Sequence, residues 1–511
     1  MADTAQPSPS TGIVTAEAGT ADRPAERPVS GASQCPTPVC MIGAGTSGVI
    51  AAKVLKQHGI AYDCFEKGSG IGGVWRFRND NGLSACYRSL HINTSKRMMV
   101  LSDFPFKPRV AEYPSHQDIL EYFEAYVDHF GVRPHLTFNT TVTQVERLAD
   151  GRFQVDFTGP EGAQRRRYDT VIVANGHHWE PRRVTFPGHF EGIEFHAHQY
   201  VDIDEPYQLR DKVVIVVGSG NSAMDIACEL SRPGAAGQVY LAQRSGVWIV
   251  PKVVGNLSQD RFVRHPMVKP GAWERCYRRC LPRSLRLFCS NLLLETLCRW
   301  VVGHPRRFGL KSPQHRFWGH HPTISQEVIT RLIHGDLIPK GTIQRLQGRD
   351  VVFEDRTTVE ADAIIYCTGY RIRFPFFDPA FVSAPANDLA LFQRLIHPDY
   401  PNLLFLGLVQ PLCALQPLVE LQAHFLASYL KGESVLPPPP AVGWATRAYH
   451  DQMKRQFSRS ESHTIQVDCP EYTYDLRQEW RRGLRRAGRK AYPLPVDTLA
   501  KPALAPSDSL Y

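Results

Sequence analysis

The 511-residue sequence lacks the features of a membrane-spanning or exported protein. It contains no run of about 18 charge-free apolar residues, which is the length that a transmembrane helix needs. The N-terminus, MADTAQPSPS, has neither the basic region nor the apolar core of a secretory signal. We therefore expect a cytoplasmic protein, with any membrane contact confined to the membrane surface.

The sequence also lacks a cysteine arrangement that would carry chemistry. None of the twelve cysteines belongs to a CxxC pair, which a dithiol redox centre requires. The closest pair, Cys276 and Cys280, has no histidine or further cysteine at zinc spacing, so we expect no metal site. Scattered cysteines in a long chain predict reduced thiols.

Charge and composition exclude two further classes of protein. Lys and Arg number 59 against 50 Asp and Glu, and the resulting formal charge of +9 is modest for this length. This balance favours anionic cofactors or an anionic membrane surface over nucleic acid. Apolar residues make up 43% of the chain, enough for a large core, which excludes a fully disordered protein. Only residues 1–36, rich in Ala, Pro, Thr, Ser and Gly, are predicted to form a disordered tail.

Hydrophobic patterning predicts the same strand–helix–strand unit twice, as in nucleotide-binding folds. The predicted strand, helix and strand lie at 38–42, 49–59 and 62–66 in the first unit and at 212–217, 222–230 and 239–243 in the second. Between the two units, Ser115-His116-Gln117-Asp118 resembles a capping box that opens a helix. Short apolar strands are also predicted at 170–174, 363–367 and 403–406, and a stiff proline spacer at 436–440.

The first unit contains a phosphate-binding loop, Gly43-Ala44-Gly45-Thr46-Ser47-Gly48, with the spacing GxGxxG between strand and helix. Its glycines permit a tight turn, a close approach of the backbone to a pyrophosphate, and packing of helix on strand. The helix N-terminus adds free N–H groups and a partial positive charge. Glu66 ends the next strand, where an acidic side chain accepts a hydrogen bond from a ribose hydroxyl.

The second unit carries the GxGxxA variant, Gly218-Ser219-Gly220-Asn221-Ser222-Ala223. Its next strand ends in Gln243-Arg244 and has no acid there. Arg244 is suited to pair with a ribose 2′-phosphate, which would select NADPH over NADH. A single glycine motif is a weak signal, but two in the same local setting indicate two dinucleotides, FAD and NADPH.

We therefore predict an α/β protein with two Rossmann-like dinucleotide-binding domains, the NADPH domain being inserted into a split FAD domain. The predicted boundaries are 1–36 for the tail, 37–207 and 336–440 for the two parts of the FAD domain, 208–335 for the NADPH domain with a basic amphipathic insertion, and 441–511 for a C-terminal extension.

A further motif separates this chain from disulfide reductases, which need a redox-active cysteine pair beside the flavin. Phe190, Gly192, His196 and Tyr200 form FxGxxxHxxxY just before the second unit. With this motif the sequence resembles the flavin-containing monooxygenase family, among the class B flavoprotein monooxygenases. The resemblance runs from about residue 39 to about residue 438. It includes Gly72-Gly73-Val74-Trp75, Asn93-Thr94-Ser95-Lys96, Asp103-Phe104-Pro105-Phe106, Gly176-His177-His178 and Cys367-Thr368-Gly369-Tyr370.

The resemblance implies an NADPH-dependent flavin monooxygenase of the N,N-dimethylaniline type. In that family NADPH reduces FAD, the reduced flavin captures O₂ as a 4a-hydroperoxide, and bound NADP⁺ shields this adduct from water. A soft nitrogen or sulfur nucleophile of a small organic substrate then takes the distal oxygen. The cofactors carry the difficult chemistry, and the protein positions groups and excludes water.

The resemblance also assigns roles to residues by motif. Asn93 matches the family's active-site asparagine, whose amide contacts NADP⁺ and the oxygenated flavin; the alternative is a turn asparagine. For His196 and Tyr200 an architectural and a catalytic role both stay open, and His177 and His178 are expected to pack the loop. Flavin-lining positions are matched by Val74, Trp75 and Thr94, and the NADP-contacting turn by Ser222, Ala223, Met224 and Asp225.

The substrate leaves an alternative open. Family members dedicated to Baeyer–Villiger oxidation of ketones usually end the fingerprint in Trp and carry Arg-Tyr-Pro-Gly after the GGxW motif. This chain has Tyr200 and Arg76-Phe77-Arg78-Asn79 at those places, which favours oxygenation of nitrogen or sulfur. Ketone oxidation is the second hypothesis, and a non-catalytic dinucleotide-binding protein is the third.

The stretch 261–311 is rich in Arg and also contains apolar residues, and two hypotheses are open for it. A basic amphipathic insertion of this kind is typical of peripheral contact with anionic lipid. The alternative, which we favour, is that it packs on the enzyme above the substrate site. The basic stretch 477–490 is expected to be a solvated helix. No oligomeric state and no nucleic-acid partner are predicted.

Overall fold

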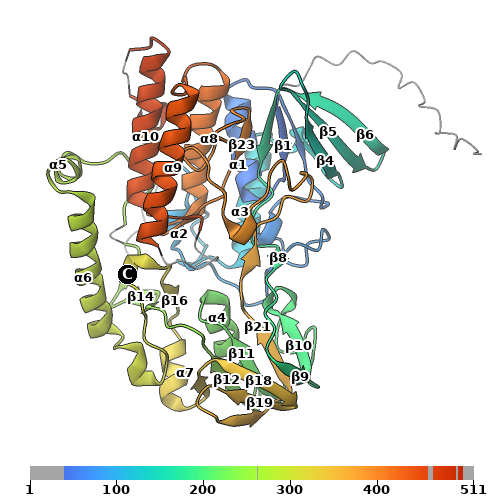
Figure 1. Cartoon of the computed structure of the whole chain (residues 1–511), viewed down its shortest axis with the longest axis vertical. Helices are drawn as coiled ribbons and strands as arrows, with labels where there is room; N and C mark the ends of the chain where they lie inside the picture. Colours follow the sequence, from blue (N-terminus) through green and yellow to red (C-terminus); the bar gives the residue numbers. More distant parts are fainter. Residues whose placement is uncertain (1–38, 262, 458–463, 491–492, 499–511) are drawn as a thin grey trace, which may run out of the picture. The chain divides into compact units, whose positions relative to one another are not determined.

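Two parallel five-stranded sheets form the framework of the chain (Figure 1). The structure is a computed structural model that describes residues 39–261, 263–457, 464–490 and 493–498. The predicted tail, 1–36, lies outside the described residues.

The first sheet has the strand order β23-β7-β1-β2-β3, and every pair in it is parallel. Its central strands are completely buried because their residues are apolar on both faces. Helix α1, Thr46–Gln57, connects the two strands of the first predicted unit, which is confirmed. The strands are β1 Val39–Ile42, β2 Tyr62–Phe65, β3 Leu136–Thr137, β7 Thr170–Val173 and β23 Leu403–Phe405.

The second sheet has the order β10-β21-β11-β12-β17 and is also parallel. Helix α4, Asn221–Leu230, connects β11 to β12, as the second predicted unit requires. The sheet begins before residue 208 and continues past residue 335, the limits predicted for its domain. The strands are β10 Ile193–His196, β11 Val213–Val217, β12 Gln238–Ala242, β17 Leu337–Lys340 and β21 Ala363–Tyr366.

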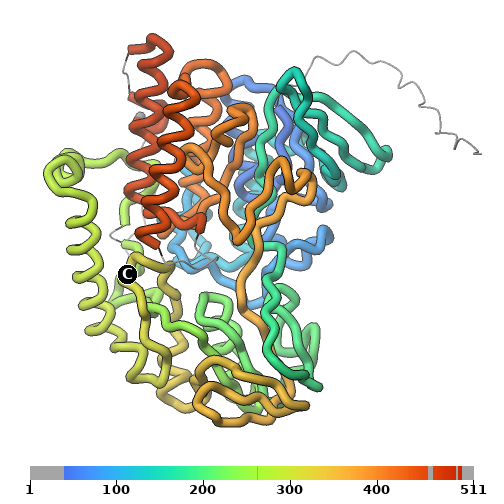
Figure 2. The backbone as a smooth tube through the Cα atoms, in the orientation of Figure 1, coloured from blue at the N-terminus to red at the C-terminus, as the bar shows by residue number. Residues whose placement is uncertain are grey.

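The chain leaves the first sheet after β7, builds the second sheet and returns to add β23 beside β7 (Figure 2). One α/β unit is therefore inserted into another that is split, which confirms the predicted fold class. The outgoing and returning segments pair as short antiparallel strands, β8 Glu180–Pro181 and β22 Tyr370–Arg371. Because the outgoing and returning segments pair with each other, they restrict the relative motion of the two units more than a single linker would.

Smaller sheets complete both units, and the patterning of the sequence did not predict them. An antiparallel meander consists of β4 Thr141–Arg147, β5 Phe153–Gly159 and β6 Gly162–Tyr168. The second unit carries β9 Gly188–Phe190 beside β18 Ile343–Gly348, β19 Asp350–Phe353 and β20 Thr358–Glu360. Short pairs are β13 Ile249–Val250 with β16 Thr323–Ile324, and β14 Val253–Val254 with β15 Leu257–Ser258.

Helices cover the first sheet and tie the C-terminal region to it. Helix α1 packs against α8, Leu415–Leu430, and α3, His116–His129. The predicted capping box is confirmed, because the Ser115 hydroxyl accepts from the Asp118 amide and the Asp118 carboxylate accepts from the Ser115 amide. The other helices are α2 Lys96–Met99, α5 Ala272–Cys280, α6 Arg283–Val301, α7 Val328–His334, α9 Pro439–Gln456, α10 Cys469–Arg486 and α11 Pro495–Thr498.

The region after residue 440 is part of the core of the first unit where it is described. Tyr472, Leu476 and Trp480 of α10 are buried in the same cluster as α1 and α8. The predicted proline spacer is only partly extended, because helix α9 begins at Pro439. Proline is tolerated in the first turn of a helix, where its missing N–H has no acceptor.

One cysteine prediction is wrong. Cys413 and Cys469 form a disulfide, although the sequence predicted reduced thiols throughout. The two residues are 56 positions apart, and β24, Gln410–Pro411, pairs with β25, Gln466–Val467, just before each of them. A pairing between distant segments leaves no local pattern in the sequence, so the counting of cysteine spacings missed it.

Candidate active site

The first phosphate loop is closed tightly at two of its glycines and open at the third. A Cβ on Gly43 would lie 2.7 Å from the Ala174 carbonyl oxygen, and a Cβ on Gly48 would lie 2.0 Å from the Gly43 carbonyl oxygen. A Cβ on Gly45 would meet nothing nearer than 3.7 Å. The protein therefore fills the space at the first and last glycines and leaves room at the middle one, as a bound pyrophosphate requires.

Glu66 holds this loop from behind. It is buried, and its carboxylate accepts hydrogen bonds from the amides of Ala44, at 2.8 Å, and Gly68, at 2.9 Å. The Asn81 carboxamide donates a third bond at 3.2 Å. Charge-assisted bonds of this kind are roughly twice as strong as neutral ones, so the loop is held in shape before any ligand binds. The predicted contact of Glu66 with a ribose stays a prediction.

The GGxW turn packs on the same loop. The Gly72 amide donates to the Ala44 carbonyl oxygen at 3.2 Å, and Val74 and Trp75 follow in a short 3₁₀ turn, half-buried. On another side, a Cβ on Gly407 would come within 2.3 Å of the Ser47 hydroxyl oxygen. Val74 and Trp75 therefore lie beside the first loop, and their predicted contact with a flavin stays a prediction.

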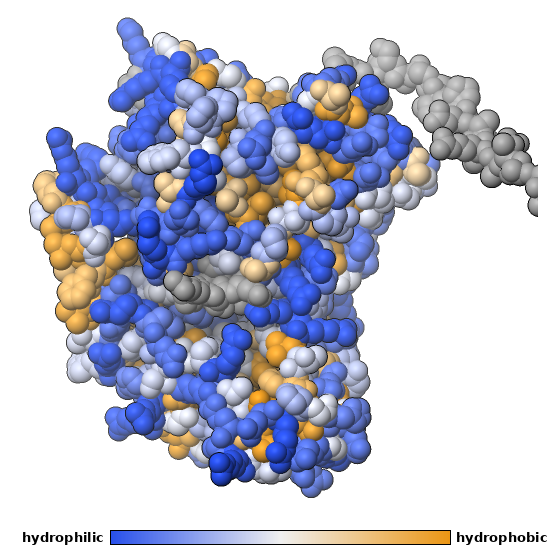
Figure 3. Space-filling view, viewed as in Figure 1, coloured by the Kyte–Doolittle hydropathy of each residue, from blue (hydrophilic) through white to orange (hydrophobic). Residues whose placement is uncertain are grey.

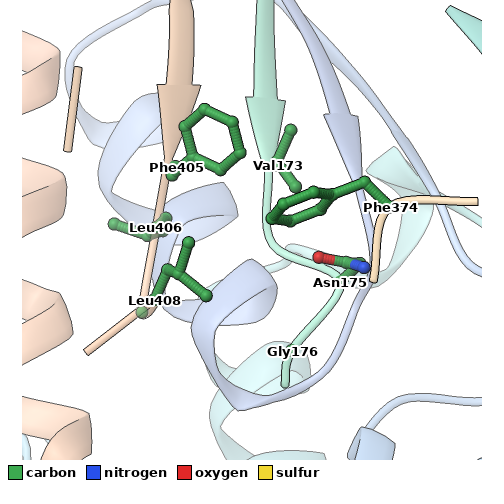
Figure 4. Close-up of a pocket in the computed structure, with 8 residues that line it drawn as sticks. Val173, Asn175, Gly176, Phe374, Phe405, Leu406 and Leu408 are labelled. Atoms are coloured by element: carbon green, nitrogen blue, oxygen red, sulfur yellow. The ribbon is translucent and has the colours of Figure 1, made fainter. Parts of the chain in front are cut away.

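A small, mostly apolar pocket lies at the carboxyl ends of β7 and β23, next to the first loop (Figure 4). Its apolar lining includes Phe374, Phe405 and Val173. Asn175 and Gly176 come from the segment after β7. The Asn175 carboxamide donates to the Arg373 carbonyl oxygen at 2.9 Å, which ties the outgoing crossing of the chain to the returning one.

The second phosphate loop shows the same contrast between its glycines. A Cβ on Gly218 would lie 2.7 Å from the Cys367 carbonyl oxygen, whereas a Cβ on Gly220 would meet nothing within 4 Å. The loop is held by β16: the Thr323 hydroxyl donates to the Ser219 carbonyl oxygen, and the Asn221 carboxamide oxygen accepts from the Ile324 amide, both at 2.8 Å.

The other predicted residues of the second loop differ in exposure. Ser222 is exposed, whereas Ala223 and Met224 are completely buried in the core of the second unit. Met224 is therefore a core residue whose amide donates to the Gly220 carbonyl oxygen at 3.1 Å, and its predicted contact with NADP stays a prediction. The Asp225 carboxylate accepts from the Tyr87 hydroxyl at 2.7 Å, and burial raises the pKa of Asp225.

Arg244 lies just past the carboxyl end of β12 with its side chain exposed. Lys311, which the motifs did not indicate, is its neighbour, since the Lys311 ammonium donates to the Arg244 carbonyl oxygen at 3.2 Å. The Lys311 ammonium also pairs with Glu354 at 2.7 Å, so Arg244 is the side chain here that suits an additional phosphate.

Asn93 and Thr94 lie half-buried on a segment that connects the two units. The Asn93 carboxamide oxygen is buried and accepts no hydrogen bond from the described residues. A buried acceptor without a donor is costly, so this atom fits a site completed by a ligand. Upstream on the same segment, Tyr87 bonds to Asp225 and Ser89 to Glu229, both residues of α4.

The fingerprint residues lie where the two units join. Position 192 requires glycine, because a Cβ there would lie 2.5 Å from the Phe190 ring and 2.6 Å from the Asp362 carbonyl oxygen. His196 ends β10 and accepts from the His198 amide at 3.0 Å, and burial lowers its pKa to about 4. The buried Tyr200 ring lies edge-on to Tyr87, with 6.2 Å between centroids.

Tyr370 is a centre of aromatic contacts that the sequence did not reveal. Its ring lies 5.4 Å from His196, 5.6 Å from His178 and 5.8 Å from His198, measured between centroids. His177 contacts His178 at 4.2 Å. Two segments, one with His178 and one with His196 and His198, therefore meet on one side chain of the returning crossing, and the predicted packing role of His177 and His178 stays a prediction.

Comparisons with known proteins agree with this geometry. The sequence matches the profile of the family described as Flavin-binding monooxygenase-like over residues 37–480. It is 32% identical to dimethylaniline monooxygenase [N-oxide-forming] 2 of Rattus norvegicus, covering 86% of this chain and 82% of the relative. It is 33% identical to flavin-containing monooxygenase 5 of Oryctolagus cuniculus, covering 84% and 80%.

Solved structures show the same fold at lower identity. S-allyl-L-cysteine S-oxygenase from Allium sativum superimposes with a TM-score of 0.63 at 24% identity, covering 89% of each chain. A cyclohexanone monooxygenase gives a TM-score of 0.63 at 17% identity, covering 88% of this chain and 98% of the neighbour. The match over most of the length, together with the two phosphate loops, shows that this chain belongs to the flavin-binding monooxygenase-like family.

Proposed function

We propose that this chain is an NADPH-dependent FAD monooxygenase that transfers one oxygen atom of O₂ to a nitrogen or sulfur centre of a small organic molecule. The observation that carries the proposal is the pairing of two phosphate loops, each open at its middle glycine, with the Asn93 carboxamide oxygen on the segment between them, which is buried and has no donor among the described residues. FAD, when bound, would accept hydride from NADPH and activate O₂.

The two loops and a few motif residues have defined parts in this proposal. The first loop, backed by Glu66, holds the FAD pyrophosphate, and Val74, Trp75 and Thr94 line the flavin. The second loop holds the NADPH pyrophosphate, and Arg244 pairs with its 2′-phosphate. The Asn93 carboxamide, whose oxygen is buried, would offer NADP⁺ a hydrogen-bond donor and an acceptor.

Nitrogen and sulfur centres are favoured over ketones for two reasons. The fingerprint ends in Tyr200, and Arg76-Phe77-Arg78-Asn79 stands where Arg-Tyr-Pro-Gly would indicate ketone oxidation. A relative that is 32% identical over most of the chain is named for forming N-oxides. Ketone oxidation is the alternative outcome of the test.

The test measures NADPH oxidation, H₂O₂ release and oxygen-18 incorporation by the purified holoenzyme with an amine, a sulfide and a ketone. We expect labelled oxygen in the amine or sulfide product. Label only in an ester supports ketone oxidation, and a protein that leaves NADPH unoxidised contradicts the proposal. Asn93→Ala should raise H₂O₂ released per NADPH by about tenfold, whereas Asn256→Ala, on the exposed turn between β14 and β15, should not.

A second part of the proposal concerns the basic insertion. We infer peripheral contact of α5 and α6 with an anionic bilayer, of the kind found at cytoplasmic leaflets. None of the helices in the described part of the chain is both long and apolar enough to span a bilayer. The outward side of these two helices is nevertheless hydrophobic (Figure 3), with Trp273 81%, Leu293 67% and Trp300 85% exposed.

The polarity of α6 is reversed relative to an ordinary surface helix. Its inward side makes the polar contacts: Glu295 pairs with Arg316 at 2.7 Å, and Asn291 accepts from the Trp318 amide at 2.8 Å. Its outward side repeats apolar residues at helical spacing, namely Leu285, Phe288, Cys289, Leu292, Leu293, Leu297 and Trp300. Exposed Arg279 before this stripe and Arg306 and Arg307 after it complement anionic headgroups.

Vesicle flotation tests this contact. The enzyme should float with phosphatidylcholine vesicles that contain phosphatidylserine, at low salt, and the double variant Leu293→Glu, Trp300→Glu should not. Trp444→Glu is the matched control, because Trp444 is 68% exposed on α9. Absence of flotation at low salt, or a concentration-dependent dimer that the double variant abolishes, contradicts the contact with lipid.

A further inference from the structure

The segment that carries Asn93 is held by a second segment 166 positions further along the chain. The Gln259 carboxamide donates to the Asn93 carbonyl oxygen at 3.4 Å, and the Asp260 carboxylate accepts from the Ser95 amide at 2.8 Å. Asp260 is 5% exposed and Ser95 is completely buried, so water does not compete for this bond. A carboxylate on a buried backbone amide fixes the position of that amide strongly.

The contact between the two segments is reciprocal. One Arg97 guanidinium nitrogen donates to the carbonyl oxygens of Asp260 and Arg261, each at 2.7 Å, and to that of Val263 at 3.3 Å. Downstream, a ring nitrogen of His265 lies 2.9 Å from the Val100 carbonyl oxygen. The segments therefore bind each other along their length, and Asp260 is the charged residue of the second segment that bonds beside Asn93, at the Ser95 amide.

Among the residues that the structure describes, none forms a hydrogen bond with the Asn93 side chain that would orient it. Its carboxamide oxygen is buried without a donor from the described residues, so its direction depends on the backbone that carries it. Before Asn93, Tyr87 and Ser89 bond to residues of α4 and hold the backbone there. At and after Asn93, Gln259 and Asp260 bond to its backbone. A displacement of the backbone by an ångström is enough to misplace a reacting group.

We propose that Asp260 is a positioning residue for Asn93, holding the carboxamide in its working direction through the Ser95 amide, with Gln259 as a weaker second contact. This inference rests on the role proposed above for Asn93. It assigns to a segment outside both phosphate loops a part in directing reducing equivalents to substrate and away from H₂O₂.

The experiment compares Asp260→Ala, Asp260→Asn, Gln259→Ala and Asn93→Ala with the double variant Asp260→Ala, Asn93→Ala. Glu295→Gln is the matched control, because Glu295 is also buried and also accepts from a backbone amide, that of Phe317 at 3.0 Å, but it contacts no residue of the Asn93 segment. The three measurements are hydrogen–deuterium exchange of peptides covering 93–100, the Kd of NADP⁺, and H₂O₂ released per NADPH oxidised.

We expect Asp260→Ala to speed exchange at the Ser95 amide by about tenfold or more, to weaken NADP⁺ and to raise H₂O₂ release severalfold. Asp260→Asn should have smaller effects, since its amide retains one acceptor oxygen, and Gln259→Ala the smallest. The double variant should release no more H₂O₂ than Asn93→Ala alone, because Asp260 acts through Asn93. Glu295→Gln should match the parent enzyme in all three measurements.

Three outcomes overturn the inference. The first is unchanged hydrogen–deuterium exchange over 93–100 in Asp260→Ala. The second is that Asp260→Ala releases as much H₂O₂ as the parent enzyme. The third is that the effects of Asp260→Ala and Asn93→Ala on H₂O₂ release multiply in the double variant. Should Asp260→Ala fail to fold, the Asp260→Asn and Gln259→Ala variants give the same comparison. Failure of the proposed function itself looks different: the parent enzyme then leaves NADPH unoxidised, whereas the exchange measurement still reports on the Ser95–Asp260 bond.

Discussion

Both phosphate loops are closely packed at the first glycine and open at the middle one, but different residues support the two loops. Behind the first loop, the residue that follows β2 is Glu66, whose carboxylate accepts from the loop's own Ala44 amide. Behind the second, the residue that follows β12 is Gln243, whose carboxamide accepts instead from the Lys311 amide at 3.3 Å. The second loop relies on β16, a strand about one hundred residues further on.

The surroundings of the loops differ in the same direction. The GGxW turn and Gly407 close the first loop from two more sides. At the second loop Gly220 and Ser222 are exposed, and Arg244 stands exposed beside it. A loop fixed in its bound shape retains its ligand more tightly, because less ordering remains to be done on binding. The contrast fits one dinucleotide that stays bound and one that is exchanged in each turnover.

The largest expected effect comes from adding a methyl group at the first loop. Gly48→Ala places a Cβ 2.0 Å from the Gly43 carbonyl oxygen, so the loop must open and FAD affinity should fall by more than about 100-fold. Visible flavin absorbance per protein after purification measures it. The second loop has Ala223 at this place, and Ala223→Gly should keep its flavin. A fully yellow Gly48→Ala protein would contradict the comparison.

The next effect separates the supports of the loops. Glu66→Ala leaves the Ala44 and Gly68 amides without their acceptor, and a lost charged hydrogen bond costs about 1.5–3 kcal/mol, so FAD should bind roughly 10- to 100-fold more weakly. Quenching of FAD fluorescence by the apoprotein measures the Kd. Gln243→Ala should leave that Kd unchanged. Equal losses in the two variants would show that the loops do not differ in this way.

Arg244→Ala should act on the second dinucleotide only. Loss of one exposed guanidinium from a phosphate should raise the KM for NADPH by roughly tenfold while the KM for NADH stays the same. Arg345→Ala, exposed on β18, is the control. Steady-state kinetics with both nucleotides gives the ratio, and a parallel rise in both KM values would remove Arg244 from the 2′-phosphate site.

The last effect changes stability and leaves both dinucleotide sites as they are, and it concerns the helix layer behind the first loop. Glu420 on α8 is completely buried beside the ion pair of Lys53 with Asp103, and it accepts from the Ser102 amide at 3.0 Å. Burial raises the pKa of Glu420 to about 7. Because the unfolded carboxyl ionises near its ordinary pKa of about 4.5, the folded protein should lose up to about 3 kcal/mol of stability as pH rises between these values.

Thermal unfolding from acid to neutral pH tests the Glu420 prediction. The stability of the parent protein should fall with rising pH across this window relative to Glu420→Gln, which cannot ionise. Glu121→Gln, whose parent residue is exposed and paired with Arg109, serves as the control and should follow the parent. Parallel curves for the parent and Glu420→Gln would mean that Glu420 is ionised in the fold throughout.

The sequence predicted those parts of the fold that local residue patterns determine. Both phosphate loops, the helix capped at Ser115 and the buried strands of the two units follow from residues a few positions apart, and the structure has all of them. Residue periodicity does not determine which distant strands pair. Hence the second sheet gained Ile193–His196 and Ala363–Tyr366 from beyond its predicted limits.

The same distinction applies to the site. The motif matches predicted Asn93, but nothing near Gln259 and Asp260 in the sequence shows that they meet the segment that carries it. Met224 matches a motif, yet its side chain is in the core, since a motif records residue type and not the direction of a side chain. Contacts made across the fold were the part that local spacing did not reveal.

The bond between Cys413 and Cys469 turns the intervening polypeptide into a covalent ring. A protease that cuts this ring once breaks a peptide bond without releasing a fragment. On a denaturing gel the nicked protein should therefore run as one band until a reductant is added and as two bands afterwards. The ring thus gives the oxidised chain a tolerance to cleavage between α8 and α10 that the reduced chain lacks.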